Sequence, residues 1–280
     1  MAIVVGSPAL DGPVVLAGAG KMGTALLSGW LGRGLEPRNV IIQEPNLAGE
    51  AAKLVSEHGI TAVPAILALP STPSVILVAV KPQAMDSLLP SLAKLVGPAT
   101  VVMSVAAGKS IASFERALPK GTAVVRAMPN TPAAIGRGIS GAVANAETTA
   151  AQKQVCEDLL GAVGDVVWLD DEALIDAVTA VSGSGPAYVF LLTEALANAG
   201  KAAGLDAATA MQLARATVSG AGELLRQSAS DPATLRQNVT SPGGTTAAAL
   251  AILMREGNGL NELMTEAVLA AQKRGRELGS

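Results

Sequence analysis

Short apolar runs rich in β-branched residues alternate with longer stretches rich in alanine and leucine over the first 170 residues. The clearest run, residues 74–80, is apolar at nearly every position, as is typical of a strand buried on both faces of a parallel sheet. The pattern predicts strands at residues 13–17, 40–43, 60–63, 74–80, 100–104, 122–126, 139–144 and 166–168. It predicts helices at 21–31, 47–58, after Pro82, at 110–118 and at 147–161. This alternation indicates a doubly wound, mostly parallel α/β sheet.

The strand pattern stops near residue 170, and only helices are predicted beyond it, at residues 173–181, 187–203, 207–227, 245–255 and 260–276. The last helix carries an apolar stripe at a period of about 3.6 residues, formed by Leu260, Leu263, Met264, Ala267, Val268 and Ala271. We therefore expect two domains, residues 1–170 and residues 171–280. The second is predicted to be all-helical, and its low charge favours close packing of helices between subunits.

The composition excludes several functional classes. The chain has 280 residues, of which 50% are apolar and 15% charged, with a net charge of −3 and no long basic block, so a nucleic-acid partner is not expected. A single cysteine, Cys156, and a single histidine exclude a disulfide framework and a zinc site built from cysteine and histidine, so we expect no metal. Cys156 lies in a predicted helix and is interpreted as a packing residue.

A membrane location is not expected, because the longest apolar runs are far shorter than the ~20 residues of a spanning helix. Residues 1–12 show neither the basic nor the apolar region of a signal peptide. The sequence therefore predicts a cytoplasmic protein with no membrane partner.

A glycine motif follows the first predicted strand directly and opens the first predicted helix. Residues 18–23 read Gly-Ala-Gly-Lys-Met-Gly, a G-x-G-x-x-G pattern. Gly18 permits the tight turn, Gly20 lets the backbone approach a pyrophosphate, and Gly23 lets the helix pack on the strand. The N–H groups at the helix start then face the phosphate charge. This context predicts a Rossmann-type dinucleotide site.

The acidic residue that could select the cofactor is Glu44, 21 positions after Gly23 and just past the second predicted strand. In NAD-binding proteins an acid about 20 residues on binds the ribose 2′-hydroxyl. Here the strand could end at Gln43 and turn Glu44 outward into solvent. The sequence therefore predicts NADPH or NADH, with electrostatics favouring NADH slightly.

The helical half contains two polar breaks rich in glycine. Residues 182–188 read Ser-Gly-Ser-Gly-Pro-Ala-Tyr, which alone would indicate a kink. Residues 238–246 contain Ser241 as a candidate N-cap and Pro242 as a candidate first helical residue. Gly243 and Gly244 would expose backbone N–H groups that suit a carboxylate. Together with a dinucleotide fold, these breaks predict a pocket for a small substrate.

The chain closely resembles the pyrroline-5-carboxylate reductase family, the last enzymes of proline biosynthesis. The resemblance runs from Val14 to about Gln272 and is carried by residues 18–23, 79–82, 126–132, 182–188, 194–205 and 238–246. It implies a Rossmann-type domain followed by an all-helical dimerisation domain. It also implies reduction of the C=N bond of L-1-pyrroline-5-carboxylate by NAD(P)H. Members of the family form homodimers and often decamers of five dimers.

The resemblance also implies roles for particular residues. The cofactor would contact Ala17, Gly18, Ala19, Gly20, Lys21, Met22, Gly23, Glu44, Ala79, Val80, Lys81, Pro82, Val105, Ala106, Ala107 and Asn238. The substrate would contact Ser241, Gly243, Gly244, Thr245 and Thr246. Its carboxylate would sit on the N–H groups of residues 244–246, and the catalytic hydroxyl of Thr246 would hydrogen-bond the ring nitrogen. Relatives often carry Asn-Arg or serines where this chain has Glu44, which leaves the cofactor preference open.

Two other functions are compatible with a dinucleotide-binding fold. A β-hydroxyacid or 6-phosphogluconate-type dehydrogenase would carry a catalytic lysine in residues 187–199, but this stretch contains no lysine, and Lys201 lies beyond it. A dinucleotide-binding regulator without activity would bind NAD(P)H without turnover. The helical half has neither histidine nor cysteine. This favours an imine, which can arrive already protonated, over a ketone, which needs a positioned acid.

Overall fold

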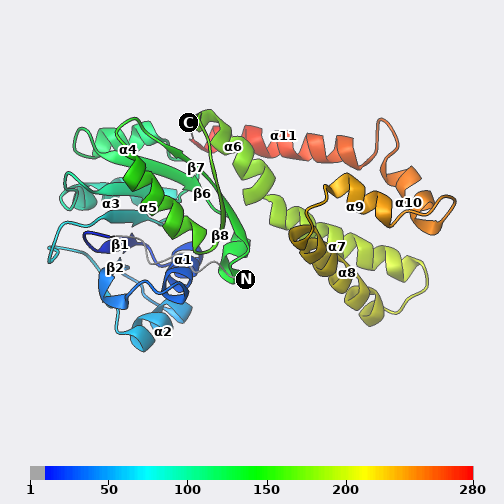
Figure 1. Cartoon of the computed structure of the whole chain (residues 1–280), viewed down its shortest axis with the longest axis horizontal. Helices are drawn as coiled ribbons and strands as arrows, with labels where there is room; N and C mark the ends of the chain where they lie inside the picture. The colour runs from blue at the N-terminus through cyan, green and yellow to red at the C-terminus, as the bar shows by residue number, and fades with distance from the viewer. Residues whose placement is uncertain (1–9, 280) are drawn as a thin grey trace. The chain divides into compact units, whose positions relative to one another are not determined.

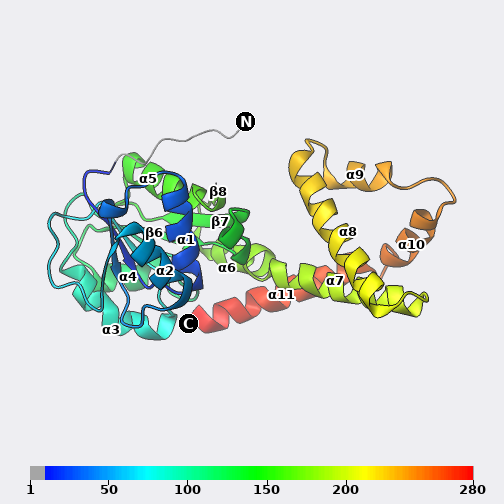
Figure 2. The ribbon, with the colours of Figure 1, turned by 90° about the horizontal axis from the view of Figure 1, so that it is seen from below.

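The chain folds into two compact units in this computed structural model, which describes residues 10–279. The first unit runs to Gly183 and also takes in the residues from Gln272 onward, and the second is Ser184–Ala271 (Figures 1 and 2). The structural boundary thus lies beyond the sequence-predicted boundary at residue 170. The expectation that the first 12 residues hold no signal peptide falls mainly on residues 1–9, which lie outside the described residues.

The first unit is built on a sheet of eight strands within the described residues, in the order β3-β2-β1-β4-β5-β6-β7-β8. The strands are β1 (Val14–Ala17), β2 (Val40–Gln43), β3 (Thr61–Val63), β4 (Val75–Val78), β5 (Val101–Ser104), β6 (Ala123–Met128), β7 (Gly138–Ala144) and β8 (Gly164–Trp168). Every neighbouring pair is parallel except β6 and β7. The prediction of a doubly wound, mostly parallel sheet is confirmed.

Helices cover both faces of this sheet. They are α1 (Lys21–Gly32), α2 (Gly49–His58), α3 (Pro82–Ala93), α4 (Ile111–Ala117), α5 (Ala150–Gly161) and α6 (Ile175–Val178). Three 3₁₀ turns, Pro37–Asn39, Thr131–Ile135 and Glu172–Leu174, and a π-helical turn, Thr179–Gly183, complete the unit. The predicted end of α2 is correct, because Gly59 caps it with a left-handed φ of 63°.

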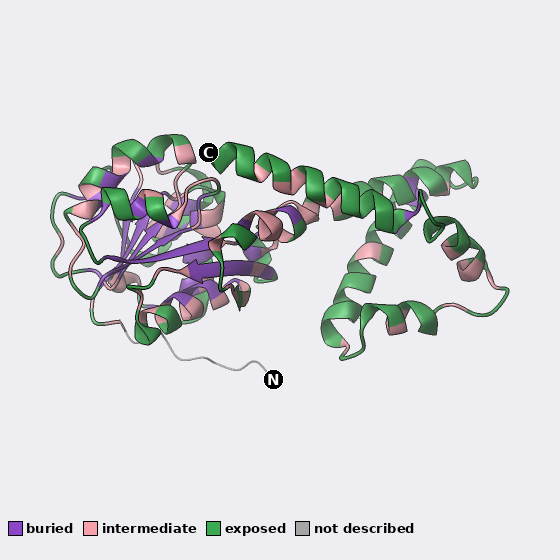
Figure 3. Ribbon diagram, turned by 90° about the horizontal axis from the view of Figure 1, so that it is seen from above, coloured by how far each residue is buried: buried purple, intermediate pink, exposed green. Residues whose placement is uncertain are grey.

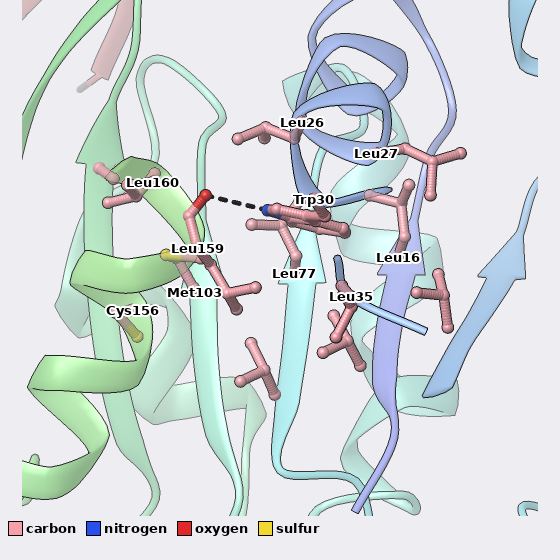
Figure 4. Packing of buried hydrophobic residues seen from close by; sticks show 14 of the residues in the cluster. Leu16, Leu26, Leu27, Trp30, Leu35, Leu77, Met103, Cys156, Leu159 and Leu160 are labelled. Atoms are coloured by element: carbon pink, nitrogen blue, oxygen red, sulfur yellow. Dashed lines mark hydrogen bonds between the residues drawn. The ribbon is translucent and has the colours of Figure 1, made fainter. Parts of the chain in front are cut away.

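Two apolar clusters sandwich the sheet and form the core of the first unit. One packs α1, α2 and α5 on one face, around Trp30 and Leu159. The other packs α3 and α4 on the opposite face, around Met85 and Phe114. The indole Nε1 of Trp30 donates a hydrogen bond to the Leu159 carbonyl at 2.9 Å, which fixes α1 against α5 (Figure 4). Successive residues of a strand point alternately into the two clusters, so both faces of the strand are buried. This explains why the strands read as continuous apolar runs in the sequence.

The second unit contains only helices among its described elements. They are α7 (Gly185–Ala202), α8 (Ala207–Gln227), α9 (Pro232–Asn238), α10 (Thr245–Leu253) and most of α11 (Leu260–Gly279), whose last residues belong to the first unit. α9 was not predicted from the sequence, although Asp231 caps it by accepting a hydrogen bond from Thr234 N–H at 2.9 Å. That hydrogen bond also lowers the pKa of the Asp231 carboxyl.

Most residues of the second unit are exposed (Figure 3), and many of them carry large apolar side chains. Its buried hydrophobic residues within the described chain are three alanines, Ala197, Ala210 and Ala214. Phe190 on α7 and Leu263 on α11 are both 63% exposed. An exposed apolar surface of this extent indicates an interaction surface rather than a surface that faces solvent.

One helical stretch of the described residues, Glu172–Ala202, is long and apolar enough by composition to cross a membrane. Its residues up to Gly183 belong to the folded first unit, where Ile175 and Ala180 are buried. The same stretch changes from a 3₁₀ turn to α, π and again α geometry along its length. These features describe a packed segment followed by the exposed helix α7, rather than one uniform helix.

Candidate functional site

The glycine motif lies where the order of the sheet reverses direction. β1 has β2 on one side and β4 on the other, so the connections diverge there, and ligands bind at the carboxyl ends of such strands. Gly18 follows β1 with a φ of +98°, and a Cβ on it would lie 2.8 Å from the Ala79 carbonyl. Only glycine fits this turn, because both the backbone conformation and the neighbouring chain exclude a side chain.

The start of α1 is open to a phosphate. Gly20 is the N-cap residue, its backbone is extended, and no side chain caps the helix. A Cβ on Gly20 would meet nothing within 4 Å, whereas one on Gly23 would collide with the Gly18 carbonyl oxygen. The first N–H groups of a helix lack intrahelical partners and carry the positive end of its dipole. The turn therefore has the form required to hold the pyrophosphate of a dinucleotide.

A groove of about 840 Å³ extends from this turn across the end of β2. Five of the residues implied for the cofactor line it, namely Ala19, Gly20, Lys21, Met22 and Glu44. The other residues that line it were not predicted from the sequence; they are Thr24, Ala25, Ser28, Asn46, Ala48, Glu50, Ala51, Thr131 and Ala134. Thr131 and Ala134 come from the turn after β6, so only the fold brings them beside α1. The volume lies within the ~300–1,000 Å³ of ordinary ligand sites.

The other predicted cofactor segments lie at the same edge of the sheet but do not line this groove. Ala79 follows β4, and its N–H donates to the Ala17 carbonyl at 2.8 Å, which places residues 79–82 beside the glycine turn. Lys81 is the N-cap of α3 and Pro82 its first residue. Val105 follows β5 and its N–H donates to the Val78 carbonyl at 3.1 Å, so residues 105–107 begin one strand further along.

Glu44 is turned toward the glycine motif rather than away from it. β2 ends at Gln43, as the outward alternative required. The carboxylate nevertheless accepts hydrogen bonds from Ala19 N–H at Oε2 and from Asn46 N–H at Oε1, both at 2.9 Å. The side chain is half-buried in the wall of the groove. A chain turn after β2, which the sequence does not specify, sets this orientation.

Part of the 126–132 motif has a structural role that the sequence analysis did not identify. Arg126 on β6 is buried and donates to Glu172 Oε1 at 2.7 Å. The same oxygen accepts a hydrogen bond from Ile111 N–H at the start of α4, at 2.9 Å. A buried arginine needs such a carboxylate, because an unpaired buried charge is strongly destabilising. The pair ties β6 and α4 to the segment that leads into α6.

The predicted substrate turn lies in the second unit and differs from the expectation at its helix start. Ser241 was expected to be the N-cap, but α10 begins at Thr245 and its N-cap is Gly244. The reason is a tight turn in which Gly243 has a φ of +68° and Gly244 N–H donates to the Ser241 carbonyl at 3.0 Å. Gly244 N–H is therefore engaged, which leaves Thr245 and Thr246 at the uncapped start of the helix.

Asn238, the remaining residue implied for the cofactor, is the last residue of α9 and is exposed. The helix that carries it ends just before the Ser241–Thr246 turn. Asn238 thus belongs to the second unit together with the predicted substrate residues.

Comparison with known proteins identifies the family. A family model described as pyrroline-5-carboxylate reductase dimerisation matches residues 172–278. The pyrroline-5-carboxylate reductase of Pseudomonas aeruginosa is 42% identical over 265 residues, which cover 95% of this chain and 96% of the relative. The chain belongs to the pyrroline-5-carboxylate reductase family. The homologue from Synechocystis is 40% identical and covers 94% of this chain and 97% of its own.

Solved structures of the family have the same fold. A pyrroline-5-carboxylate reductase from Coxiella burnetii superposes with a TM-score of 0.87 at 32% identity and covers 96% of this chain and 99% of its own. A Plasmodium falciparum pyrroline carboxylate reductase, solved with NADP bound, gives a TM-score of 0.79 at 26% identity, with 96% and 99% coverage. A model described as NADP oxidoreductase, coenzyme F420-dependent, matches only residues 13–108, the part that contains the glycine motif and groove.

Proposed function

We propose that this chain is an NAD(P)H-dependent reductase that converts L-1-pyrroline-5-carboxylate to L-proline. The observation that carries the proposal is the 42% identity to a pyrroline-5-carboxylate reductase along 95% of the chain. The open helix start and the groove agree with it, because they supply the dinucleotide site that such a reductase needs. The reduced nicotinamide, when bound, supplies the hydride that the C=N carbon accepts.

The first unit binds and orients the cofactor in this proposal. The N–H groups at the start of α1 hold the pyrophosphate, and the extended, side-chain-free backbone at Gly20 lets it approach closely. Residues 79–82 and 105–107 follow the neighbouring strands β4 and β5, and ligands bind at the carboxyl ends of such strands, so the nicotinamide half is assigned to these segments.

The start of α10 binds the substrate carboxylate. Its N–H groups at Thr245 and Thr246 have no cap, and the helix is nine residues long, so a carboxylate there satisfies donors and complements the dipole. The resemblance implies that the N–H groups of residues 244–246 hold the carboxylate. Because Gly244 N–H already donates to the Ser241 carbonyl, only those of Thr245 and Thr246 are available. The Ser241 hydroxyl adds a third donor to this set.

The Thr246 hydroxyl is the group proposed to contact the ring nitrogen. The second unit contains no histidine or cysteine, and Tyr188 is its only tyrosine. A protonated cyclic imine brings its own proton, so the hydroxyl needs only to hold the nitrogen in place while the carbon accepts the hydride. Orientation of the two reacting carbons then supplies most of the acceleration. The product is a secondary amine, and no further acid is needed.

A homodimer is the proposed working unit. The match of residues 172–278 to a dimerisation model and the exposed apolar side chains of α7 and α11 support it. We also propose the decamer of five dimers that the resemblance implies, and a cytoplasmic location. A second subunit over α7 would cover the apolar stretch that by composition alone would suit a membrane.

The decisive experiment is the oxidation of NADH and of NADPH by the purified protein with and without pyrroline-5-carboxylate. We expect loss of the reduced-nicotinamide absorbance only when the imine is present, and formation of proline in equal amount. A 2-oxo acid of similar size should not be reduced, because the site offers no positioned acid for a carbonyl oxygen. Binding of the cofactors without any imine-dependent oxidation would contradict the proposal and indicate a regulator.

A further inference from the structure

The position of Glu44 bears on which of the two cofactors the groove accepts. It follows β2 directly and lines the groove together with Ala19 and Gly20 of the glycine turn. In a dinucleotide fold the ribose of the adenosine half lies beside the end of this strand. The 2′ substituent, a hydroxyl in NADH and a phosphate in NADPH, is therefore placed next to this carboxylate.

The hydrogen bonds of Glu44 hold the carboxylate in that place. Its two oxygens accept from Ala19 N–H and Asn46 N–H, each at 2.9 Å. Hydrogen bonds to an ionised group are roughly twice as strong as those between neutral groups. Rotating the side chain out of the groove to admit a phosphate would break both, so the carboxylate is not a freely mobile surface charge.

The remaining acceptor capacity of Glu44 suits a vicinal diol. A carboxylate has about four lone-pair positions, and one on each oxygen is used by a backbone N–H group. One position per oxygen is left, and the 2′- and 3′-hydroxyls of a ribose are two adjacent donors. A 2′-phosphate has no donor at neutral pH apart from a partial proton and adds negative charge at the same point.

The charges around the groove give a 2′-phosphate little compensation. The charged side chains that line it are Lys21, Glu44 and Glu50. Lys21 is the first residue of α1, where the pyrophosphate is expected. Lys53 on α2 lies 4.0 Å from both Glu50 and Glu57.

An arginine that could receive the phosphate is missing from the residues that line the groove. Arg38, the arginine closest to β2 in sequence, precedes the strand rather than following it, and it pairs with Glu36. In dinucleotide folds that accept NADPH, an arginine near the end of β2 commonly binds the 2′-phosphate.

We propose that Glu44 makes this member of the family selective for NADH over NADPH. It does so by accepting the ribose hydroxyls while it remains fixed to the glycine turn. This inference rests on the proposed function only for its kinetic readout, because selectivity at the ribose is a property of binding. The Plasmodium relative solved with NADP shows that the family fold itself accepts the phosphate, so the difference is assigned to this side chain and its surroundings.

The test compares NADH with NADPH in steady-state kinetics for the wild type, Glu44→Ser and Glu44→Gln. For the wild type we expect kcat/KM with NADH to exceed that with NADPH about tenfold to a hundredfold, the range that one like-charge contact gives at a partly exposed site. In both variants the ratio should fall to near one or invert. The change should appear mainly in KM, because the ribose contact is equal in ground and transition states.

A matched control is Glu36→Gln, which removes one carboxylate from the opposite end of the same strand. It should leave the cofactor ratio unchanged, because it alters net charge by the same amount without touching the groove. Thermal unfolding of each variant checks that it is folded. Glu44→Gln keeps a side chain of the same shape, so it serves if Glu44→Ser does not fold.

Binding of ADP-ribose and of 2′-phospho-ADP-ribose, measured by calorimetry, separates this inference from the proposed function. Neither ligand carries a nicotinamide, so the result needs no imine reduction. Preference of the wild type for ADP-ribose that is lost in Glu44→Gln supports the inference even if the imine proves inert. A wild type that prefers NADPH overturns the inference. So does an NADH/NADPH ratio that stays within about twofold of the wild-type value in both Glu44 variants.

Discussion

The side-chain amide of Asn130 links two segments that lie 52 residues apart. Its Nδ2 donates to the Ser182 carbonyl at 3.2 Å, and its Oδ1 accepts from Ile139 N–H at 3.0 Å. Asn130 is buried, and Ser182 lies in the π-helical turn. One amide thus joins the loop after β6, the strand β7 and the turn that precedes α7. The motifs at 126–132 and 182–188 both contribute to this contact.

Changing Asn130 to aspartate should destabilise the first unit. Asn130→Asp keeps an acceptor for Ile139 N–H but places a carboxylate oxygen against the Ser182 carbonyl in place of a donor. We expect the free energy of unfolding to fall by about 2–3 kcal/mol, the cost of an unsatisfied or repelled buried polar group. Urea unfolding measures it. The same amide-to-acid change at Gln83, which is exposed, should alter the free energy of unfolding by no more than about 0.5 kcal/mol. Equal losses of stability at both positions would contradict the linking role of Asn130.

Gly20→Val should abolish dinucleotide binding while leaving the fold intact. The backbone of Gly20 is extended, and a Cβ there meets nothing within 4 Å, so valine fits the protein itself. Its side chain would occupy the space that a pyrophosphate needs at the start of α1. We expect at least about a hundredfold rise in the Kd for NADH, with an unchanged melting temperature.

Gly32→Val is the control for that substitution. Gly32 is the last residue of the same helix, and a Cβ on it likewise meets nothing within 4 Å. It lies at the opposite end of α1 from the glycine turn, so binding should be retained. Retained NADH binding in Gly20→Val would show that the pyrophosphate lies elsewhere.

The strands and the glycine turn could be predicted because their signals are local. β2 has the predicted bounds, residues 40–43, since an apolar run between turn residues defines it. Gly18 and Gly59 occupy the positive-φ positions that their places after a strand and a helix suggested. Backbone conformation depends on neighbouring residues, so sequence patterns specify it well.

The walls of the groove and the start of α10 could not be predicted in the same way. Thr131 and Ala134 reach the groove only because the 3₁₀ turn after β6 packs against α1, a contact between segments that are about 100 residues apart in the sequence. Ser241-Pro242 resembles a helix start, but the positive φ of Gly243 inserts a turn and delays the helix to Thr245. Leu260, Leu263 and Met264 of α11 are exposed on the apolar stripe that the sequence predicts, but a helical period does not specify what covers the stripe.

Cys156 should be unreactive in the folded protein. Burial raises the pKa of its thiol to about 12, so the reactive thiolate is almost absent at pH 8. Because Cys156 is the only cysteine, labelling by a thiol reagent should follow global unfolding. Fast stoichiometric labelling of the native protein at pH 8 would contradict the burial of this side chain.

The same pKa predicts a dependence of stability on pH. The unfolded thiol loses its proton at about pH 8.5, whereas the folded one retains it to about pH 12. The unfolded state therefore binds fewer protons in this window, and the free energy of unfolding falls with rising pH by up to about 1.4 kcal/mol per pH unit. Cys156→Ala removes this contribution. The difference in slope between wild type and variant above about pH 9 measures it, and parallel slopes would count against it.

Thr246→Ala should lower kcat with little change in cofactor binding. The proposed hydroxyl contact is to the substrate nitrogen, and losing one such contact typically costs about tenfold to a hundredfold in turnover. Thr246→Ser should recover most of the activity, because it restores the hydroxyl. Thr245→Ala is the control: the role proposed for Thr245 uses its backbone N–H, which alanine retains. An equal loss in both alanine variants, or weaker NADH binding in Thr246→Ala, would argue against this placement.

Leu263→Glu should dissociate the proposed dimer. Leu263 is 63% exposed on α11 and lies on the apolar stripe that the sequence predicts, so a partner subunit would bury it. A charge there loses the ~1.5–3 kcal/mol of a buried leucine in each subunit and adds an unpaired carboxylate, which should raise the dimer Kd at least a hundredfold. Light scattering over a concentration series measures the mass. Leu67→Glu makes the same exchange at a position that is 94% exposed in the first unit, and it should leave the mass unchanged. A Leu263→Glu protein with the mass of the wild type would show that α11 does not form the interface.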